Sequence, residues 1–146
     1  MRQMKQSLIY CAIIFPSICY SEQVINLASD KDVAFDVLNK TWVCDMQDSM
    51  AGELGVWSLH YSGGNQVTGS ITIPKYTMCN SDRLEGRIKG NLVTYFAYTK
   101  GFCGSIIGNI KFFSDEENKY YANGHYTYGG TRKRGTYNCE LQTNPE

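Results

Sequence analysis

The sequence has no excess of charge of either sign, no familiar catalytic motif and only two histidines. Its 146 residues hold 14 Lys and Arg against 14 Asp and Glu, so a strongly basic nucleic-acid binder is not indicated. It contains no G-x-S-x-G, no H-E-x-x-H and no phosphate-binding glycine loop. Without a nucleophile, base and metal set, we expect a protein that is not an enzyme and that needs neither cofactor nor metal.

A long apolar run is also lacking. The longest apolar stretch, Leu8 to Ile18, covers about 11 residues, whereas a helix that crosses a bilayer needs roughly 20. Arg2 and Lys5 precede it and small residues follow it, which is typical of a signal peptide over residues 1–21 with cleavage after Ser21. We therefore expect a secreted or periplasmic protein with no membrane span in its mature chain.

Closely spaced cysteine pairs are absent, although cysteine itself is not. Of six cysteines two lie in the predicted signal peptide, which leaves Cys44, Cys79, Cys103 and Cys139. In an oxidising compartment four cysteines predict two disulfides, with three possible pairings. A structural zinc site usually uses C-x2-C pairs, which these spacings do not provide.

Glycine is missing from Glu22 to Met50, and all fourteen glycines lie between Gly52 and Gly135. This contrast separates an N-terminal segment, 22–40, from a glycine-punctuated body, 41–146. The segment contains "ASDKDVAFDVLNK", in which Ser29 or Asp30 can cap a short helix. Its predicted apolar side consists of Val33, Phe35, Val37 and Leu38.

From residue 41 onward apolar and polar residues alternate with a period of two, which predicts half-buried strands. Short turns rich in Gly and Asn separate eight such stretches. This pattern predicts an all-β fold, an up-and-down antiparallel barrel of about eight strands; a sandwich is the alternative. Ten strands would result if Gly108-Asn109 and Asn123-Gly124 were turns. The predicted inward residues are Trp42, Cys44 and Met46; Trp57, Leu59 and Tyr61; Val67, Gly69, Ile71 and Ile73; Leu84, Gly86 and Ile88; Leu92, Phe96 and Tyr98; Ile106, Ile110 and Phe112; Tyr120, Ala122, Gly124, Tyr126 and Tyr128; Tyr137, Cys139 and Leu141.

The first and last predicted strands share one arrangement: "TWVC" at 41–44 and "TYNC" at 136–139. If the barrel closes, these strands are neighbours and their cysteines both face the interior. We therefore predict a disulfide between Cys44 and Cys139 at the seam, and a second between Cys79 and Cys103 in the long loop.

In outline the chain resembles the calycin-like secreted barrels, the lipocalin and avidin type. The resemblance rests on the short helix, on Trp42 in the first strand and on eight hairpin-linked strands; Lys40 stands where the lipocalin pattern has a glycine. It implies a barrel with one open end that holds a ligand.

Aromatic residues give the strongest indication of a binding site. Tyrosine offers a flat apolar face and a hydroxyl, which suit contact with a sugar, a ligand or a protein; alternatively, tyrosines simply fill a small barrel. The candidate ligand-binding residues are Trp42, Trp57, Tyr61, Tyr98, Tyr126 and Tyr128.

The basic run Arg132, Lys133 and Arg134 is a candidate site for an anion or a partner protein, or else a device that keeps a strand flank soluble. The main functional hypothesis is a non-enzymatic binding protein that holds a small molecule or glycan at the barrel's open end. The alternative is a protein-interaction module, such as a hydrolase inhibitor, that uses its loops and this basic hairpin.

Overall fold

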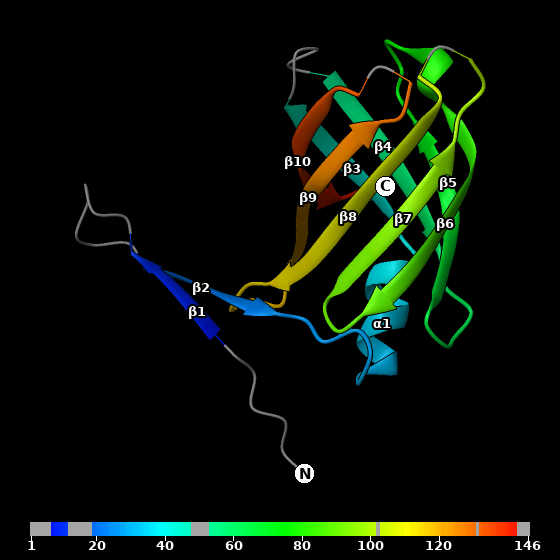
Figure 1. Cartoon of the computed structure of the whole chain (residues 1–146). Helices are drawn as coiled ribbons and strands as arrows, with labels where there is room; N and C mark the ends of the chain where they lie inside the picture. Colours follow the sequence, from blue (N-terminus) through cyan, green and yellow to red (C-terminus); the bar gives the residue numbers. More distant parts are fainter. Residues whose placement is uncertain (1–6, 12–18, 48–52, 102, 131, 143–146) are drawn as a thin grey trace.

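The computed structural model describes residues 7–11, 19–47, 53–101, 103–130 and 132–142. Eight antiparallel strands, β3 to β10, form a closed barrel with one short helix at its base (Figure 1). The elements are β1 Ser7–Cys11, β2 Cys19–Val24, α1 Lys31–Leu38, β3 Thr41–Gln47, β4 Glu53–His60, β5 Gln66–Thr72, a 3-10 turn Thr77–Cys79, β6 Ser81–Lys89, β7 Leu92–Tyr98, β8 Ser105–Ser114, β9 Tyr120–Tyr128 and β10 Arg134–Leu141.

The barrel has up-and-down connectivity. Each strand from β3 to β10 pairs with the next one along the chain, and β10 returns to pair with β3. Closure leaves no unpaired edge in this ring of strands. The predicted fold class and the predicted count of eight strands are confirmed.

Alternation places the expected side chains inside in seven of the eight strands. Trp42, Trp57, Ile71, Leu84 and Phe112, for example, are all at most 1 % exposed. Burial of such side chains contributes roughly 1.5 to 3 kcal/mol each, so the interior supplies the main stabilisation of the barrel.

The prediction for β7 is wrong. Val93, Tyr95 and Ala97 point inward and are buried, whereas Phe96 is half-buried and Tyr98 is exposed on the outer face. The two alternating sets of side chains in this strand are both largely apolar, so either set can be mistaken for the inward one. A shift of one residue moves every side chain to the other face.

The two glycine-asparagine pairs that suggested extra turns lie inside long strands. A Cβ on Gly108 would lie 2.5 Å from the Tyr95 hydroxyl, and one on Gly124 would lie still closer to the backbone carbonyl oxygen of Asn109. Glycine is therefore required here by the close approach of neighbouring atoms, not by a turn.

Helix α1 covers one end of the barrel (Figure 1). Asp30 caps it, accepting a hydrogen bond from the backbone N–H of Val33 at 3.2 Å. The buried indole N–H of Trp42 donates to the carbonyl of Val37 at 2.9 Å, which ties the helix to the first barrel strand. The predicted apolar side is correct except at Phe35, which is 45 % exposed.

Both predicted disulfides are present. Cys44 and Cys139 lie directly opposite each other in the β3–β10 pair, so this bond fastens the seam. Cys79 and Cys103 join the β5–β6 loop to the β7–β8 loop at the end of the barrel away from the helix. Two disulfides fit a protein that folds where thiols are oxidised.

A hairpin of β1 and β2 precedes the helix and was not predicted. In the described part of the chain, strand pairing joins this hairpin to the barrel through Gln23 and Val24 of β2, which lie opposite Ser114 and Phe113 of β8. Both pairing residues follow the predicted cleavage site after Ser21, and the signal peptide itself stays a prediction. Among the described residues no helix is long and apolar enough to cross a bilayer.

We predict that the seam disulfide stabilises the fold more than the loop disulfide does. The two bonds close stretches separated by 95 and 24 residues. On the chain-entropy model, replacing Cys44 and Cys139 with alanine costs about 4 to 5 kcal/mol, and replacing Cys79 and Cys103 about 3 to 4 kcal/mol. Urea denaturation of the two double variants measures the difference; the reverse order would contradict the role assigned to the seam.

Candidate functional site

The aromatic residues predicted to bind a ligand do not meet at one opening of the barrel. Trp42, Trp57, Tyr126 and Tyr128 are at most 2 % exposed, so they border almost no space in which a water molecule fits. Tyr61 is buried as well, beneath Phe35 of the helix, with ring centroids 5.0 Å apart. Their role as ligand residues stays a prediction, which this packing does not favour.

These buried rings form a continuous stack through the barrel. Tyr137 stacks on Trp57 at 5.1 Å and on Tyr126 at 5.7 Å, and Tyr126 meets Tyr128 edge to face at 5.3 Å between ring centroids. Each aromatic pair contributes about 0.5 to 1.5 kcal/mol beyond the burial of its area. The stack occupies the space in which an internal ligand would be expected.

Two tyrosine hydroxyls meet at the centre of this stack. The Tyr95 and Tyr137 hydroxyl oxygens lie 3.1 Å apart, and the Tyr137 hydroxyl donates to the carbonyl of Asn109 at 2.7 Å. Burial raises the pKa of Tyr95 to about 12, although its contacts with Tyr137 and Trp57 oppose this shift. Burial also raises the pKa of Tyr137 well above its ordinary value. The Trp57 indole N–H is close enough to act on Tyr95 but falls outside hydrogen-bond geometry with any described group.

The basic run lies at the turn between β9 and β10. Arg132 has a positive φ of 59° in that turn, and Arg134 begins β10; all three cations are exposed. In the ring of strands β10 lies four positions from β6 in either direction, and the run is not part of the β6 surface. Its role as an anion or partner site stays a prediction.

A groove of about 490 Å³ lies on the outer face of β5, β6 and β7. Its floor is the backbone around Gly86 with Val67 and Tyr95 on either side. Two rows of outward side chains, which cross the three strands in register, form its walls. The rows are Gln66, Arg87 and Thr94, and Thr68, Glu85 and Phe96.

The groove therefore carries several kinds of recognition group within one small area. Residues two apart on a strand are about 7 Å apart, and neighbouring strands are about 4.8 Å apart. A guanidinium, a carboxylate, an amide, hydroxyls and the ring of Phe96 can thus all contact one ligand of a few ring diameters. The groove thus combines apolar and polar groups on one face of the barrel.

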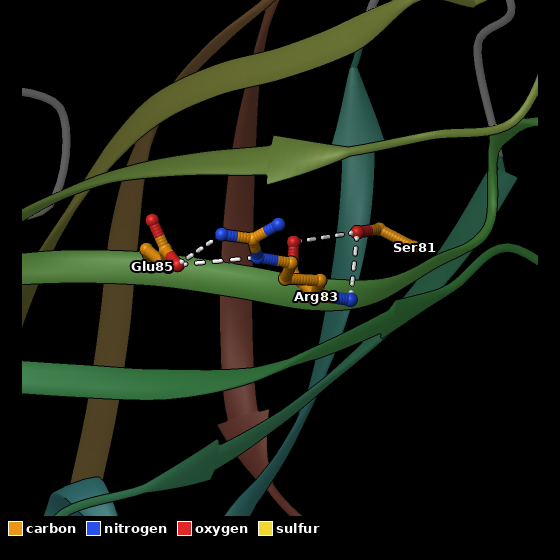
Figure 2. Close-up of polar contacts among 3 residues, drawn as sticks. All are labelled: Ser81, Arg83 and Glu85. Atoms are coloured by element: carbon orange, nitrogen blue, oxygen red, sulfur yellow. Dashed lines mark hydrogen bonds and ion pairs between the residues drawn. The ribbon is translucent and has the colours of Figure 1, made fainter.

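Contacts along β6 and β7 hold one wall in place. Arg83 donates from Nε at 3.2 Å and from Nη2 at 2.9 Å to the same oxygen of Glu85, and its guanidinium lies 4.6 Å above the ring of Tyr98. Tyr98 in turn meets Phe96 edge to face at 4.5 Å. Figure 2 shows Arg83 between Glu85 and Ser81.

A bulge in β6 gives Arg83 its position. The register between β5 and β6 shifts between Gly69 and Ile71, where β6 carries one extra residue. Asp82 and Arg83 are consequently both exposed, and Asp82 lies 3.8 Å from the ammonium group of Lys100. Ser81 fixes the bulge, since its hydroxyl accepts from the backbone N–H of Arg83 and donates to its carbonyl (Figure 2).

Sequence reasoning missed this site through its error in β7. Phe96 was assigned to the interior, and its partners in β5 and β6 were assigned only to a solvated face. Thr94 carried the signal: it shares a phase with Phe96 and Tyr98, whereas Val93, Tyr95 and Ala97 form a phase without a polar residue. Of the predicted ligand residues only Tyr98 lies beside the groove.

The described residues include no group of three or more His, Cys, Asp or Glu side chains placed to hold a metal ion. Comparison of the chain with protein families, with curated proteins and with solved structures finds no match. Residue roles therefore rest on the geometry of the groove alone.

We predict that the tyrosine pair makes the fold sensitive to alkali. Burial favours the neutral form of the Tyr95 hydroxyl and raises its pKa from 10.0 in the unfolded chain to about 12 in the folded protein. The contribution of Tyr95 to stability is therefore complete below pH 10 and is lost as pH rises toward about 12. The free energy of unfolding should fall by about 3 kcal/mol over this range, and less in Tyr95→Phe.

Urea denaturation across this pH range, together with the ultraviolet absorbance of tyrosinate, measures the effect. Full tyrosinate absorbance near pH 10 from a protein that still has native circular dichroism would contradict the buried pair.

Proposed function

We propose that this chain is a non-enzymatic binding protein whose recognition site is the outer groove on β5, β6 and β7, and that its ligand is a glycan. The observation that carries the proposal is the half-buried ring of Phe96, which lies in a groove walled by polar side chains. An interior site is less well supported, because the aromatic stack fills the barrel where the sequence placed a ligand.

The chemistry of the groove suits a sugar. A sugar ring has an apolar face of C–H groups and a rim of hydroxyls, so it needs a flat apolar partner and several donors and acceptors around it. Phe96 provides the flat partner; Gln66, Thr68 and Thr94 provide amide and hydroxyl groups at the rim. The volume of about 490 Å³ suits a ligand of two or three rings.

Arg83 and Tyr98 support the site by restricting side-chain motion. Glu85 accepts two hydrogen bonds from Arg83, and Phe96 packs against Tyr98, which the guanidinium covers. Groups that are already held in place lose less conformational freedom when a ligand binds. The closed eight-stranded barrel also supports a calycin-like assignment, which we propose as the family of the fold.

Replacing Phe96 with alanine tests the site. We expect binding to a glycan identified on a neutral and acidic glycan array to weaken about tenfold or more, because the stacking partner is lost. Phe35→Ala is the matched control, since Phe35 is an aromatic residue that is 45 % exposed on α1, outside the groove. Titration calorimetry measures affinity, and thermal unfolding verifies that both variants fold. Equal affinity of the two variants would overturn the proposal.

Protein docking on the same face is a second candidate, supported by Ile107. This side chain is 50 % exposed on β8 opposite Phe96, outside the groove, and it extends the apolar surface from Phe96 onto β8. Exposed Tyr, Phe and Arg side chains are also common where proteins meet. If the partner is a protein, Ile107→Ser should weaken its capture from the secreted fraction; if the ligand is a glycan, Ile107→Ser should leave glycan affinity unchanged.

A further inference from the structure

The exposed side chains of β6 carry slightly more positive than negative charge. They are Asp82, Arg83, Glu85, Arg87 and Lys89, three cations against two carboxylates, in a chain whose formal net charge is zero. The flanking strands β5 and β7 contribute only uncharged outward side chains to the lining of the groove. These are Gln66, Thr68, Thr94 and Phe96. The charged residues that line the groove are Glu85 and Arg87, and the further cations Arg83 and Lys89 lie on β6 outside this lining.

Ion pairing neutralises part of this set and leaves Arg87 available. Arg83 is occupied by Glu85, whose carboxylate oxygen accepts both of its hydrogen bonds. Arg87 is exposed in the opposite wall, between Gln66 and Thr94, and makes no ion pair with any described residue. Its guanidinium can donate two parallel hydrogen bonds to a carboxylate or sulfate.

Acidic groups concentrate elsewhere on the barrel. Asp30, Asp32 and Asp36 lie in or next to α1, and burial together with the charges of Asp36 and Asp30 raises the pKa of Tyr120 at the start of β9. Residues 115–117, "DEE", form the turn that precedes β9. These carboxylates lie at the helix end of the barrel, where the β6–β7 turn also lies, because the carbonyl of Gly90 accepts hydrogen bonds from the backbone N–H groups of Leu27 and Ala28.

From this arrangement we propose that the ligand of the groove is an acidic glycan, a polysaccharide that bears carboxylate or sulfate groups. This inference rests on the proposed function. It adds that the ligand is negatively charged and that Arg87 binds its acidic group. A sugar ring stacks on Phe96 while its acidic group, or that of the next sugar, binds Arg87 across the groove. The pairing of Arg83 with Glu85 keeps the opposite wall free of an unpaired carboxylate that would repel such a ligand.

The experiment compares charged polymers with neutral counterparts. The probes are polygalacturonate against its methyl ester, and dextran sulfate against dextran, with the full secreted protein in titration calorimetry at about 0.05 M and about 0.5 M NaCl. We expect at least one acidic polymer to bind about tenfold more tightly than its neutral counterpart at low salt, and to lose most of that advantage at high salt.

Two variants with the same change of charge locate the effect. Arg87→Gln should lower affinity for the acidic polymer about tenfold and flatten its salt dependence, because a charge-assisted pair is lost. Arg132→Gln, in the β9–β10 turn, should change affinity by less than about twofold, because Arg132 is not among the residues that line the groove. Neither residue is buried, so both variants are expected to fold.

Each outcome decides the question. Equal losses in Arg87→Gln and Arg132→Gln would overturn the groove as the anion site, and failure of every acidic polymer to bind would overturn the acidic ligand. Neutral polymers that bind as tightly, with Phe96→Ala weakened and Arg87→Gln unchanged, would overturn this inference and leave the proposed function standing. A loss in both Phe96→Ala and Arg87→Gln, specific to the acidic polymer, supports both.

Discussion

The interior of a closed eight-stranded barrel has a fixed volume, and the other features of this structure depend on how that volume is filled. Each strand contributes every second side chain to it, so choosing a phase for one strand decides both what is inside and what is outside. Here Trp57, Tyr126 and Tyr137 already form a stack across the interior. The remaining strands must supply smaller side chains or glycine where these rings approach them.

Strand β7 meets this requirement with Val93, Tyr95 and Ala97, and its larger residues consequently face outward. The Tyr95 hydroxyl fits inside because Gly108 leaves room for it and Tyr137 provides a hydrogen-bond partner. Phe96 and Tyr98 are thus excluded from a filled core, and they become the apolar part of the outer groove. In this way the packing of the interior produces the candidate site on the exterior.

This dependence explains what the sequence could and could not predict. The strand count, the seam and both disulfides follow from local signals: the period of two, the turn residues, and the matching "TWVC" and "TYNC" segments. The phase of β7 is harder to predict, because leucine, phenylalanine and tyrosine are as apolar as the residues that are actually buried, and Thr94 is the one local residue that indicates the outer face. The cross-strand contact of Tyr95 with Tyr137 supports the observed phase, and it links residues that are 42 positions apart. The β1–β2 hairpin was missed for another reason, since its segment was read as a signal peptide.

Charge shows the same difference between the sequence and the fold. Along the chain, the densest cationic cluster is Arg132, Lys133 and Arg134, and the sequence therefore predicts an anion or partner site there. In the barrel they extend from a turn, whereas Arg87 is held in a register with Gln66 and Thr94 on either side. A binding site depends on how many different groups are fixed around one point, because each pre-placed group lowers the entropy that binding must remove. By that criterion a single arginine in a cross-strand row is a better recognition residue than three on a turn.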